Sequence, residues 1–125
     1  MHIDASSFPF VRMGYDPGRD EPMDIVLGRL SELLRRGEPF VFLSEGDFND
    51  GGGEADRRNV SLWMKANKAE IVRLIKGLVH VEPDAGKRAA AEQFSAGFAK
   101  FWGYPMAVVA THQDAQQRAE GLLAR

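Results

Sequence analysis

The feature that most constrains the fold is a run of four apolar residues, Phe40-Val41-Phe42-Leu43, which three residues separate from Arg36, the last residue of an expected helix. A strand with one face in water alternates apolar and polar residues, whereas a strand covered on both faces is continuously apolar. The stretch before it, 21–36, carries its apolar residues at helical spacing, with Pro22 in the first turn and Gly37 at its end. The sequence therefore predicts a helix followed by a central strand.

The same alternation of strand and helix continues along the chain. Further strands are expected at 8–15, 78–82 and 105–110. Further helices are expected at 55–76, from beyond Asp84 to Gly103, and after a capping residue at Thr111. Short links between alternating elements imply right-handed crossovers and parallel strands. The expected fold class is α/β, with four consecutive β-α units and a mainly parallel four-stranded sheet, preceded by a frayed end that contains His2.

Length and composition narrow the classes of function. The chain has 125 residues, which suits a single domain that spans 1–125. Its formal net charge of -2 argues against phosphate-backbone binding, so no nucleic-acid partner is expected. The absence of cysteine excludes disulfides, thiol catalysis and thiolate metal sites. No apolar segment approaches the roughly 20 residues that cross a bilayer, and the N-terminus lacks signal-peptide features. We therefore expect a cytoplasmic protein without membrane insertion.

The second half of the chain, 57–123, resembles a known superfamily in the spacing of its apolar, glycine and basic residues. The residues that carry the likeness are Arg58, Trp63, Met64, Ile71, Leu74, Gly77-Leu78-Val79-His80-Val81, Lys87-Arg88, Tyr104-Pro105-Met106 and Ala115 to Leu123. In these positions the chain is similar to the STAS domains (sulfate transporter and anti-sigma-factor antagonist) and their SpoIIAA-like relatives. The resemblance implies a SpoIIAA-like (STAS-like) α/β fold and a module that acts through protein–protein contact.

The resemblance also implies that a serine between a strand and the following helix acts in some members as a phosphorylation switch. Ser44 follows the strand at 40–43, but the phosphoacceptor motif is replaced by Glu45-Gly46-Asp47-Phe48-Asn49-Asp50. A phosphate among several carboxylates is electrostatically unfavourable. The sequence therefore predicts a module without an obvious phospho-switch.

The loop from Ser44 to Asp56 is acidic and rich in glycine. The candidates for binding a partner are its acids and two arginines at the start of the next helix: Glu45, Asp47, Asp50, Glu54, Arg57 and Arg58. The stretch 45–50 is similar to a fragment of a calcium loop, but the glycine and bidentate-acid positions do not match, so no metal site is expected. The three glycines at 51–53 lack the lysine of a P-loop and lie among acids, which favours a hinge over a phosphate site.

Two further sets of residues are candidates for ligand chemistry. Trp63, Phe94 and Phe98 lie at helical spacing and are candidates for lining an apolar pocket between the sheet and the second and third helices. Core packing is the commoner role of such aromatic residues. The histidines are scattered, and His80 and Glu82 share one face of the strand at 78–82. A hydrogen-bonded structural histidine is the default for His80, with a catalytic pair as the alternative.

No nucleophile elbow, dinucleotide fingerprint, kinase set or zinc-protease motif is present, so no catalytic residue and no cofactor is assigned. We therefore expect a small STAS-like binding or regulatory module whose partner is another protein or a second copy of the chain. One alternative is a carrier or sensor of a small apolar or amphipathic ligand. The other is a metal-dependent enzyme that uses acidic residues and histidines at the carboxyl ends of the strands.

Overall fold

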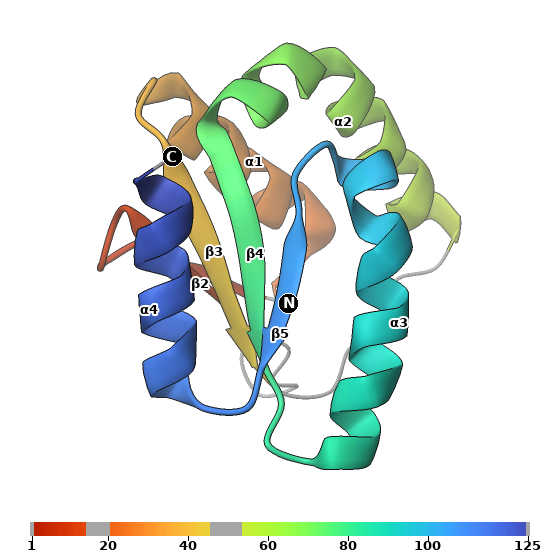
Figure 1. Ribbon diagram of the computed structural model, residues 1–125. Coiled ribbons are helices and arrows are strands. Elements are labelled where there is room, and N and C mark those ends of the chain that lie inside the picture. The colour runs from red at the N-terminus through yellow and green to blue at the C-terminus, as the bar shows by residue number, and fades with distance from the viewer. Residues whose placement is uncertain (1, 15–20, 46–53, 125) are drawn as a thin grey trace.

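The computed structural model describes residues 2–14, 21–45 and 54–124, with the backbone alone for residues 54–57 and 101. This part of the chain forms an α/β fold with a five-stranded mixed sheet and four helices (Figure 1). The strands are β1 (His2–Asp4), β2 (Phe10–Gly14), β3 (Phe40–Glu45), β4 (Ile75–Val81) and β5 (Met106–Val109). The helices are α1 (Met23–Arg35), α2 (Glu54–Leu74), α3 (Ala85–Trp102) and α4 (His112–Leu123).

The strands lie side by side in the order in which they occur in the sequence, β1-β2-β3-β4-β5. The four strands from β2 to β5 are parallel, and β1 pairs antiparallel with β2. Crossovers of one hand between consecutive parallel strands place α1, α2 and α3 on the same face of the sheet. After β5 the chain turns back, and α4 packs on the other face against β3, β4 and β5 (Figure 1).

The α/β class expected from the sequence is confirmed, but the predicted sheet of four mainly parallel strands is wrong. The sheet has a fifth, antiparallel strand, β1, in the segment that was expected to be a frayed end. His2 lies opposite Gly14 in this pair, and Ile3 is 5% exposed and belongs to the core. A three-residue strand with a single buried apolar residue leaves no periodic pattern to read.

The sheet separates two apolar clusters. The larger lies under α1, α2 and α3 and includes Phe40, Phe42, Leu78, Phe98 and Met106. The smaller lies under α4 and is built mainly from β3, β4 and α4: Val41, Val79, Val81, Ala115, Ala119 and Leu122. Because β3 and β4 contribute alternate residues to the two clusters, both strands are apolar on both faces, as the run at 40–43 predicts.

The junction between α2 and β4 differs from the helix predicted at 55–76. The helix ends at Leu74, and Ile75 already pairs with Phe40 of β3. The register then shifts, because Phe42 pairs with Leu78, so β4 holds one more residue than β3 over this interval. This irregularity lets Ile75 and Leu78, three positions apart, enter the same cluster although strand residues normally alternate.

No helix within 2–14, 21–45 and 54–124 combines the length and the apolar character needed to cross a membrane.

Gly77 lies within the irregular part of β4, where a Cβ atom would be 2.8 Å from Cδ1 of Leu122 and 3.1 Å from the carbonyl oxygen of Pro105. We predict that Gly77→Ala destabilises the fold by about 1–3 kcal/mol, because Leu122 of α4 and Pro105, just before β5, must both move away from the new methyl group. Gly28→Ala is the matched control, since a Cβ atom there meets nothing within 4 Å and an exposed helix position gains about 0.5–1 kcal/mol from alanine. Urea unfolding followed by tryptophan fluorescence measures both changes, and equal shifts would contradict the close approach.

Candidate functional site

The carboxyl ends of β3 and β4 carry the buried polar side chains of the described residues. Ser44, His80 and Glu82 are 2%, 1% and 8% exposed. Ser44 pairs with His80 in the sheet register, and the Ser44 Oγ–His80 Nδ1 distance is 2.8 Å. Both side chains point toward the face covered by α1, α2 and α3, because they alternate with residues of the α4 cluster. Ligands of open α/β sheets commonly bind at this edge.

A serine hydroxyl in contact with an imidazole is the arrangement that activates a nucleophile in acyl transfer. Here both side chains are almost fully buried, and Glu82 accepts a hydrogen bond from the backbone N–H of Asp84 at 3.1 Å. Their polar atoms are therefore used in joining strand ends to each other and to the loop that precedes α3. The pair is a buried hydrogen bond within the α1–α3 face, and the structural role expected for His80 stays a prediction.

We predict that Ser44→Ala lowers the free energy of unfolding by about 1–3 kcal/mol, because Nδ1 of His80 loses its buried partner. The control is Ser95→Ala, which removes a hydroxyl that donates to the carbonyl oxygen of Glu92 on the exposed side of α3. That change should stay within about 0.5 kcal/mol. Chemical denaturation of both variants tests the difference, and a Ser44→Ala variant as stable as Ser95→Ala would show that the pair contributes nothing.

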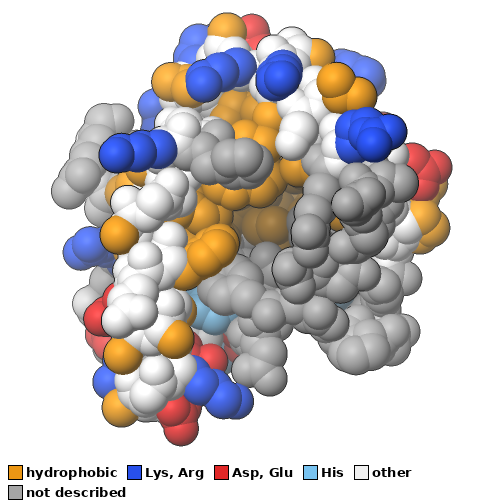
Figure 2. Space-filling view, turned by 90° about the vertical axis from the view of Figure 1, so that its right-hand side faces the viewer, with side chains coloured by type: hydrophobic (Ala, Val, Ile, Leu, Met, Phe, Trp, Pro, Cys, Tyr) orange, Lys and Arg blue, Asp and Glu red, His pale blue; other side chains and the backbone are white. Residues whose placement is uncertain are grey.

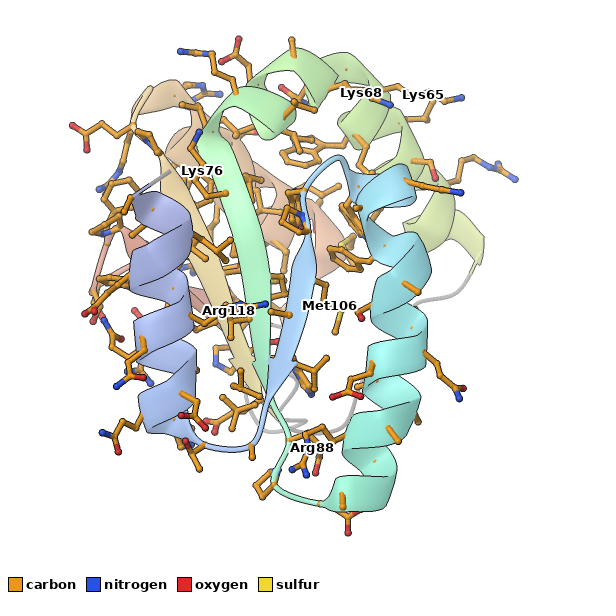
Figure 3. All side chains as sticks on the ribbon, in the orientation of Figure 1. Lys65, Lys68, Lys76, Arg88, Met106 and Arg118 are labelled. Atoms are coloured by element: carbon orange, nitrogen blue, oxygen red, sulfur yellow. The ribbon has the colours of Figure 1, made fainter. Side chains whose placement is uncertain are left out.

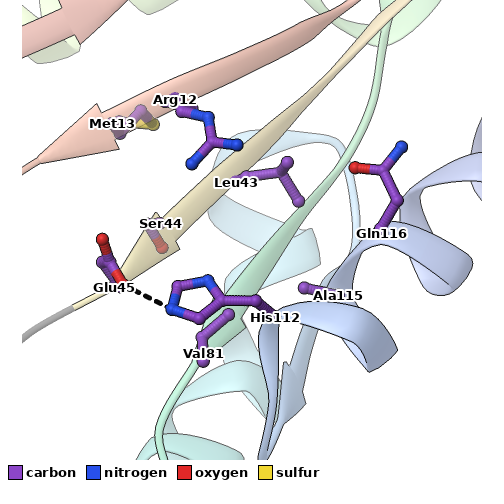
Figure 4. A pocket seen from close by; sticks show the side chains of 9 residues that line it. All are labelled: Arg12, Met13, Leu43, Ser44, Glu45, Val81, His112, Ala115 and Gln116. Atoms are coloured by element: carbon purple, nitrogen blue, oxygen red, sulfur yellow. Dashed lines mark ion pairs between the residues drawn. The ribbon is translucent and has the colours of Figure 1, made fainter.

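On the opposite face of the sheet, the same edge carries an exposed contact between a histidine and a glutamate. His112 Nε2 of α4 lies 3.0 Å from Glu45 Oε2 of β3, and their side chains are 68% and 59% exposed. Between them and β2 lies a pocket of about 70 Å³ (Figure 4). The pocket is lined by Arg12, Met13, Leu43, Ser44, Glu45, Val81, His112, Ala115 and Gln116.

The loop after β4 ends in an acidic helix cap. Asp84 is the N-cap of α3, and its carboxylate accepts a hydrogen bond from the backbone N–H of Lys87 at 2.9 Å. This bond, with help from the N–H of Gly86 and the charges of Lys87 and Arg88, holds the pKa of Asp84 below its ordinary value of 3.8. A carboxylate at this position also interacts favourably with the positive end of the helix dipole.

Because the pKa of Asp84 is lowered in the folded protein, the stability that this helix cap contributes decreases as the pH falls. A carboxyl whose pKa is lower in the folded state stabilises the fold above its unfolded pKa, and this contribution is lost as the pH falls through the folded pKa. We predict that Asp84→Ala lowers the melting temperature at pH 7 and that the two melting curves approach each other below about pH 3.8. Thermal unfolding by circular dichroism measures the effect.

The control for the cap is Asp24→Ala in the first turn of α1, whose N-cap makes no side-chain hydrogen bond. This variant should change the melting temperature less than Asp84→Ala does at pH 7. A difference between wild type and Asp84→Ala that stays constant from pH 7 to pH 2 would contradict the assignment of the cap to the ionised carboxylate.

The residues predicted to bind a partner are only partly described. Glu45 pairs with His112, whereas Asp47 and Asp50 lie outside the described residues. Glu54 and Arg57 lie in the first turn of α2, and their side chains are also outside the described part. Arg58 is exposed on α2. Their joint role as a partner-binding surface stays a prediction.

The three aromatic residues predicted to line an apolar pocket differ in their contacts and exposure. Trp63 of α2 donates from Nε1 to Oγ of Ser31 at 2.8 Å, which ties α2 to α1. Phe98 is buried and contacts the rings of Trp102 and Tyr104, at centroid distances of 5.8 and 5.4 Å. Phe94 is 57% exposed, and its ring centre lies 6.0 Å from that of Phe98. Figure 2 shows a hollow with a hydrophobic base on the side of the molecule where α3 lies, and the ligand-carrier hypothesis stays a prediction.

The metal-dependent enzyme hypothesis depends on acidic residues and histidines at the carboxyl ends of the strands. Asp47, one of these acids, lies outside the described residues, and the others are divided between the two faces of the sheet. His80 and Glu82 lie on the face under α1–α3, whereas Glu45 and His112 lie on the α4 face. Within the described ranges, no group of three or more histidine, aspartate or glutamate side chains is placed to hold a metal ion.

Two residues at the carboxyl-terminal edge of the sheet were missed by reasoning from the sequence. The pocket also contains Arg12 and Gln116, which lie on β2 and α4 and are about 100 positions apart in the chain. A signal for Arg12 did exist, because it is the polar residue between Val11 and Met13 in a strand, and alternation places it on the face opposite to theirs. Gln116 has no comparable signal.

Comparison of the chain with models of protein families, with curated proteins and with solved structures gave no match.

Proposed function

We propose that the protein is a STAS-like binding module that acts through protein–protein contact, and that the outer face of α2 is its main contact surface. The observation that carries the proposal is a pair of large aliphatic side chains in water on that face. Leu62 is 58% exposed and Val72 is 51% exposed.

The two faces of α2 differ in what they contact. Met64, Ile71 and Leu74 are buried against the sheet, with Val60 and Trp63 packed at the border of the same cluster. The residues that follow helical spacing on the opposite side are exposed: Arg58, Leu62, Lys65, Ala66, Ala69, Val72 and Arg73. Hence the exposed apolar residues there form a stripe along the helix, Leu62-Ala66-Ala69-Val72, which faces solvent except where Val72 lies against Gly103 at the end of α3.

A single exposed leucine on a soluble protein needs no explanation, but a contiguous apolar stripe bordered by polar residues marks a contact surface. Burying a leucine-sized side chain contributes about 1.5–3 kcal/mol. Two such side chains in one interface therefore supply enough energy to act as the apolar centre of a modest protein–protein contact.

The stripe is bordered by positive charge. From residue 58 to residue 74 the helix carries four basic residues, Arg58, Lys65, Lys68 and Arg73, and one acidic residue, Glu70, which gives a sum of +3 in a chain whose formal net charge is -2. Arg73 pairs with Glu70. Lys65 and Lys68 extend from α2 into solvent (Figure 3), and Lys and Arg side chains gather at the end of the molecule where α2 lies (Figure 2). A complementary partner surface is acidic, with an apolar centre.

The alternation of charge and aliphatic side chains favours a protein over a nucleic acid. Contacts to phosphates gain from Lys65 and Lys68 but nothing from Leu62 and Val72 on either side of them, and the composition argues against nucleic-acid binding. An amphipathic acidic helix laid along α2 would use both features.

The resemblance to STAS domains is consistent with this assignment, because much of it lies in α2 and the elements that follow, and it implies a protein-interaction module. Arg58, named from the sequence as a candidate contact residue, lies one turn before Leu62 on the same outer face. The proposal thus retains the start of the helix as part of the surface and moves its centre away from the acidic loop.

We predict that Leu62→Ser weakens binding of the partner about tenfold or more, because about 1.4 kcal/mol of apolar burial is lost. The partner is recovered by cross-linking in cell extract and identified by mass spectrometry, and its affinity is then measured by calorimetry; sedimentation velocity measures self-association. The matched control is Ile25→Ser on α1, which removes a 45% exposed side chain of similar size. Binding lost equally in both variants, or in neither, would overturn the assignment to α2.

The charged border adds a second readout of the same surface. Lys65→Glu should slow association and make binding less sensitive to added salt, because it removes an attraction that is screened by ions. Leu62→Ser should leave the salt dependence unchanged. An interaction without any salt dependence in the wild type would contradict an acidic partner.

A further inference from the structure

A second surface, on the other face of the sheet, has the features of a small-molecule site that is independent of the proposed partner contact. We propose that the pocket between β2 and α4 binds a small carboxylate that carries a hydroxyl or an amino group on the adjacent carbon. Arg12 would hold the carboxylate, and Glu45 would accept a hydrogen bond from the neighbouring group.

The pocket exists because α4 does not cover the whole face on which it packs. It contacts β3, β4 and β5, whereas β2 lies beyond it. On β2, Val11 is fully buried under the α1–α3 face, and Arg12, which alternation places on the α4 face, is exposed. The space between the uncovered part of β2 and the flank of α4 is the pocket seen in Figure 4.

The lining has an apolar base and a polar rim. Leu43, Val81 and Ala115 supply the apolar side chains, and Val81 and Ala115 belong to the core under α4. The pocket of about 70 Å³ is small and open to solvent on one side, so it suits a ligand of only a few non-hydrogen atoms. Glycolate, lactate, glycine and alanine are of this size.

Arg12 is the charged group available for an anion. Among the described residues it forms no ion pair, although its guanidinium lies at the pocket (Figure 4). A guanidinium presents N–H groups in a planar fork that matches the two oxygens of a carboxylate, so a bidentate contact is its best complement. A single arginine in a pocket of this size thus selects the carboxylate end of the ligand.

Glu45, across the pocket from Arg12, sets the second requirement for the ligand, which is a hydrogen-bond donor. Glu45 is held by His112 at 3.0 Å, and Gln116 lies one turn further along α4. A bare carboxylate bound to Arg12 would face the negative charge of Glu45, whereas a hydroxyl or ammonium group next to it can donate a hydrogen bond to that carboxylate. The ligand that satisfies both rims therefore has an acceptor pair and a donor on neighbouring carbons.

The test is a titration of ¹⁵N-labelled full-length protein with glycolate, lactate, glycine and alanine, followed by NMR, with acetate as the analogue that lacks the donor. We expect saturable shifts of the backbone amides of Arg12, Leu43, Glu45, His112 and Gln116 for at least one of the four probes. Acetate should bind about tenfold more weakly, because Glu45 then receives no hydrogen bond.

Variants separate this site from general ion binding. Arg12→Met should weaken binding about tenfold or more, and Glu45→Gln should remove the preference over acetate. Arg118→Met is the matched control, because Arg118 lies on the opposite flank of α4 from His112 and Gln116 and should leave binding unchanged. Leu62→Ser on α2 should also leave it unchanged, so the two proposed surfaces can fail separately.

Two results would overturn the proposal. The first is the absence of saturable shifts at the pocket with all four probes while the wild-type spectrum shows a folded protein. The second is binding that Arg12→Met and Arg118→Met weaken equally, which would assign it to the general positive charge of the surface. A preference over acetate that persists in Glu45→Gln would remove Glu45 from the site and, with it, the requirement for a donor.

Discussion

The need to cover β3 and β4 on both faces is the constraint on which the rest of the structure depends. Phe40 and Phe42 enter one apolar cluster, while Val41 and Val79 enter the other, and each of these side chains is at most 2% exposed. An α-helix with its side chains is about 10 Å wide, whereas neighbouring strands are about 4.8 Å apart, so one helix shields about two strands. Three helices are available on one face and a single helix on the other.

This unequal supply of helices explains where the polar side chains of the edge are found. Under α1, α2 and α3, the ends of the strands are enclosed, and Ser44 and His80 satisfy each other within the layer. Over the α4 face, the single helix stops short of β2, so Arg12 and Glu45 remain in contact with water and border a pocket. The carboxyl-terminal edge of the sheet therefore carries a buried Ser44–His80 hydrogen bond on one face and a solvent-accessible pocket with charged residues at its rim on the other.

The two surfaces proposed for binding are separated by the sheet. The outer face of α2 combines aliphatic side chains with positive charge and suits an acidic protein, whereas the pocket beside α4 suits a ligand of a few atoms. The side chains substituted to test the two surfaces, Leu62 and Arg12, are exposed and belong to neither apolar cluster. For this reason, Leu62→Ser and Arg12→Met can test function in a protein whose fold is unchanged.

The sequence by itself determined the features that depend on local patterns. The helical stripes, the continuously apolar run at 40–43 and the caps at Gly37, Gly103 and Thr111 are all encoded within a few residues, and the structure contains each of them. Only the tertiary structure decided the rest. β1 is too short for a pattern and exists because β2 offers it an edge, and the junction at Leu74 and Ile75 follows from pairing with β3. The candidate site depends on strand register and on how far α4 extends across the sheet, which bring Arg12 of β2 to residues of α4 a hundred positions away.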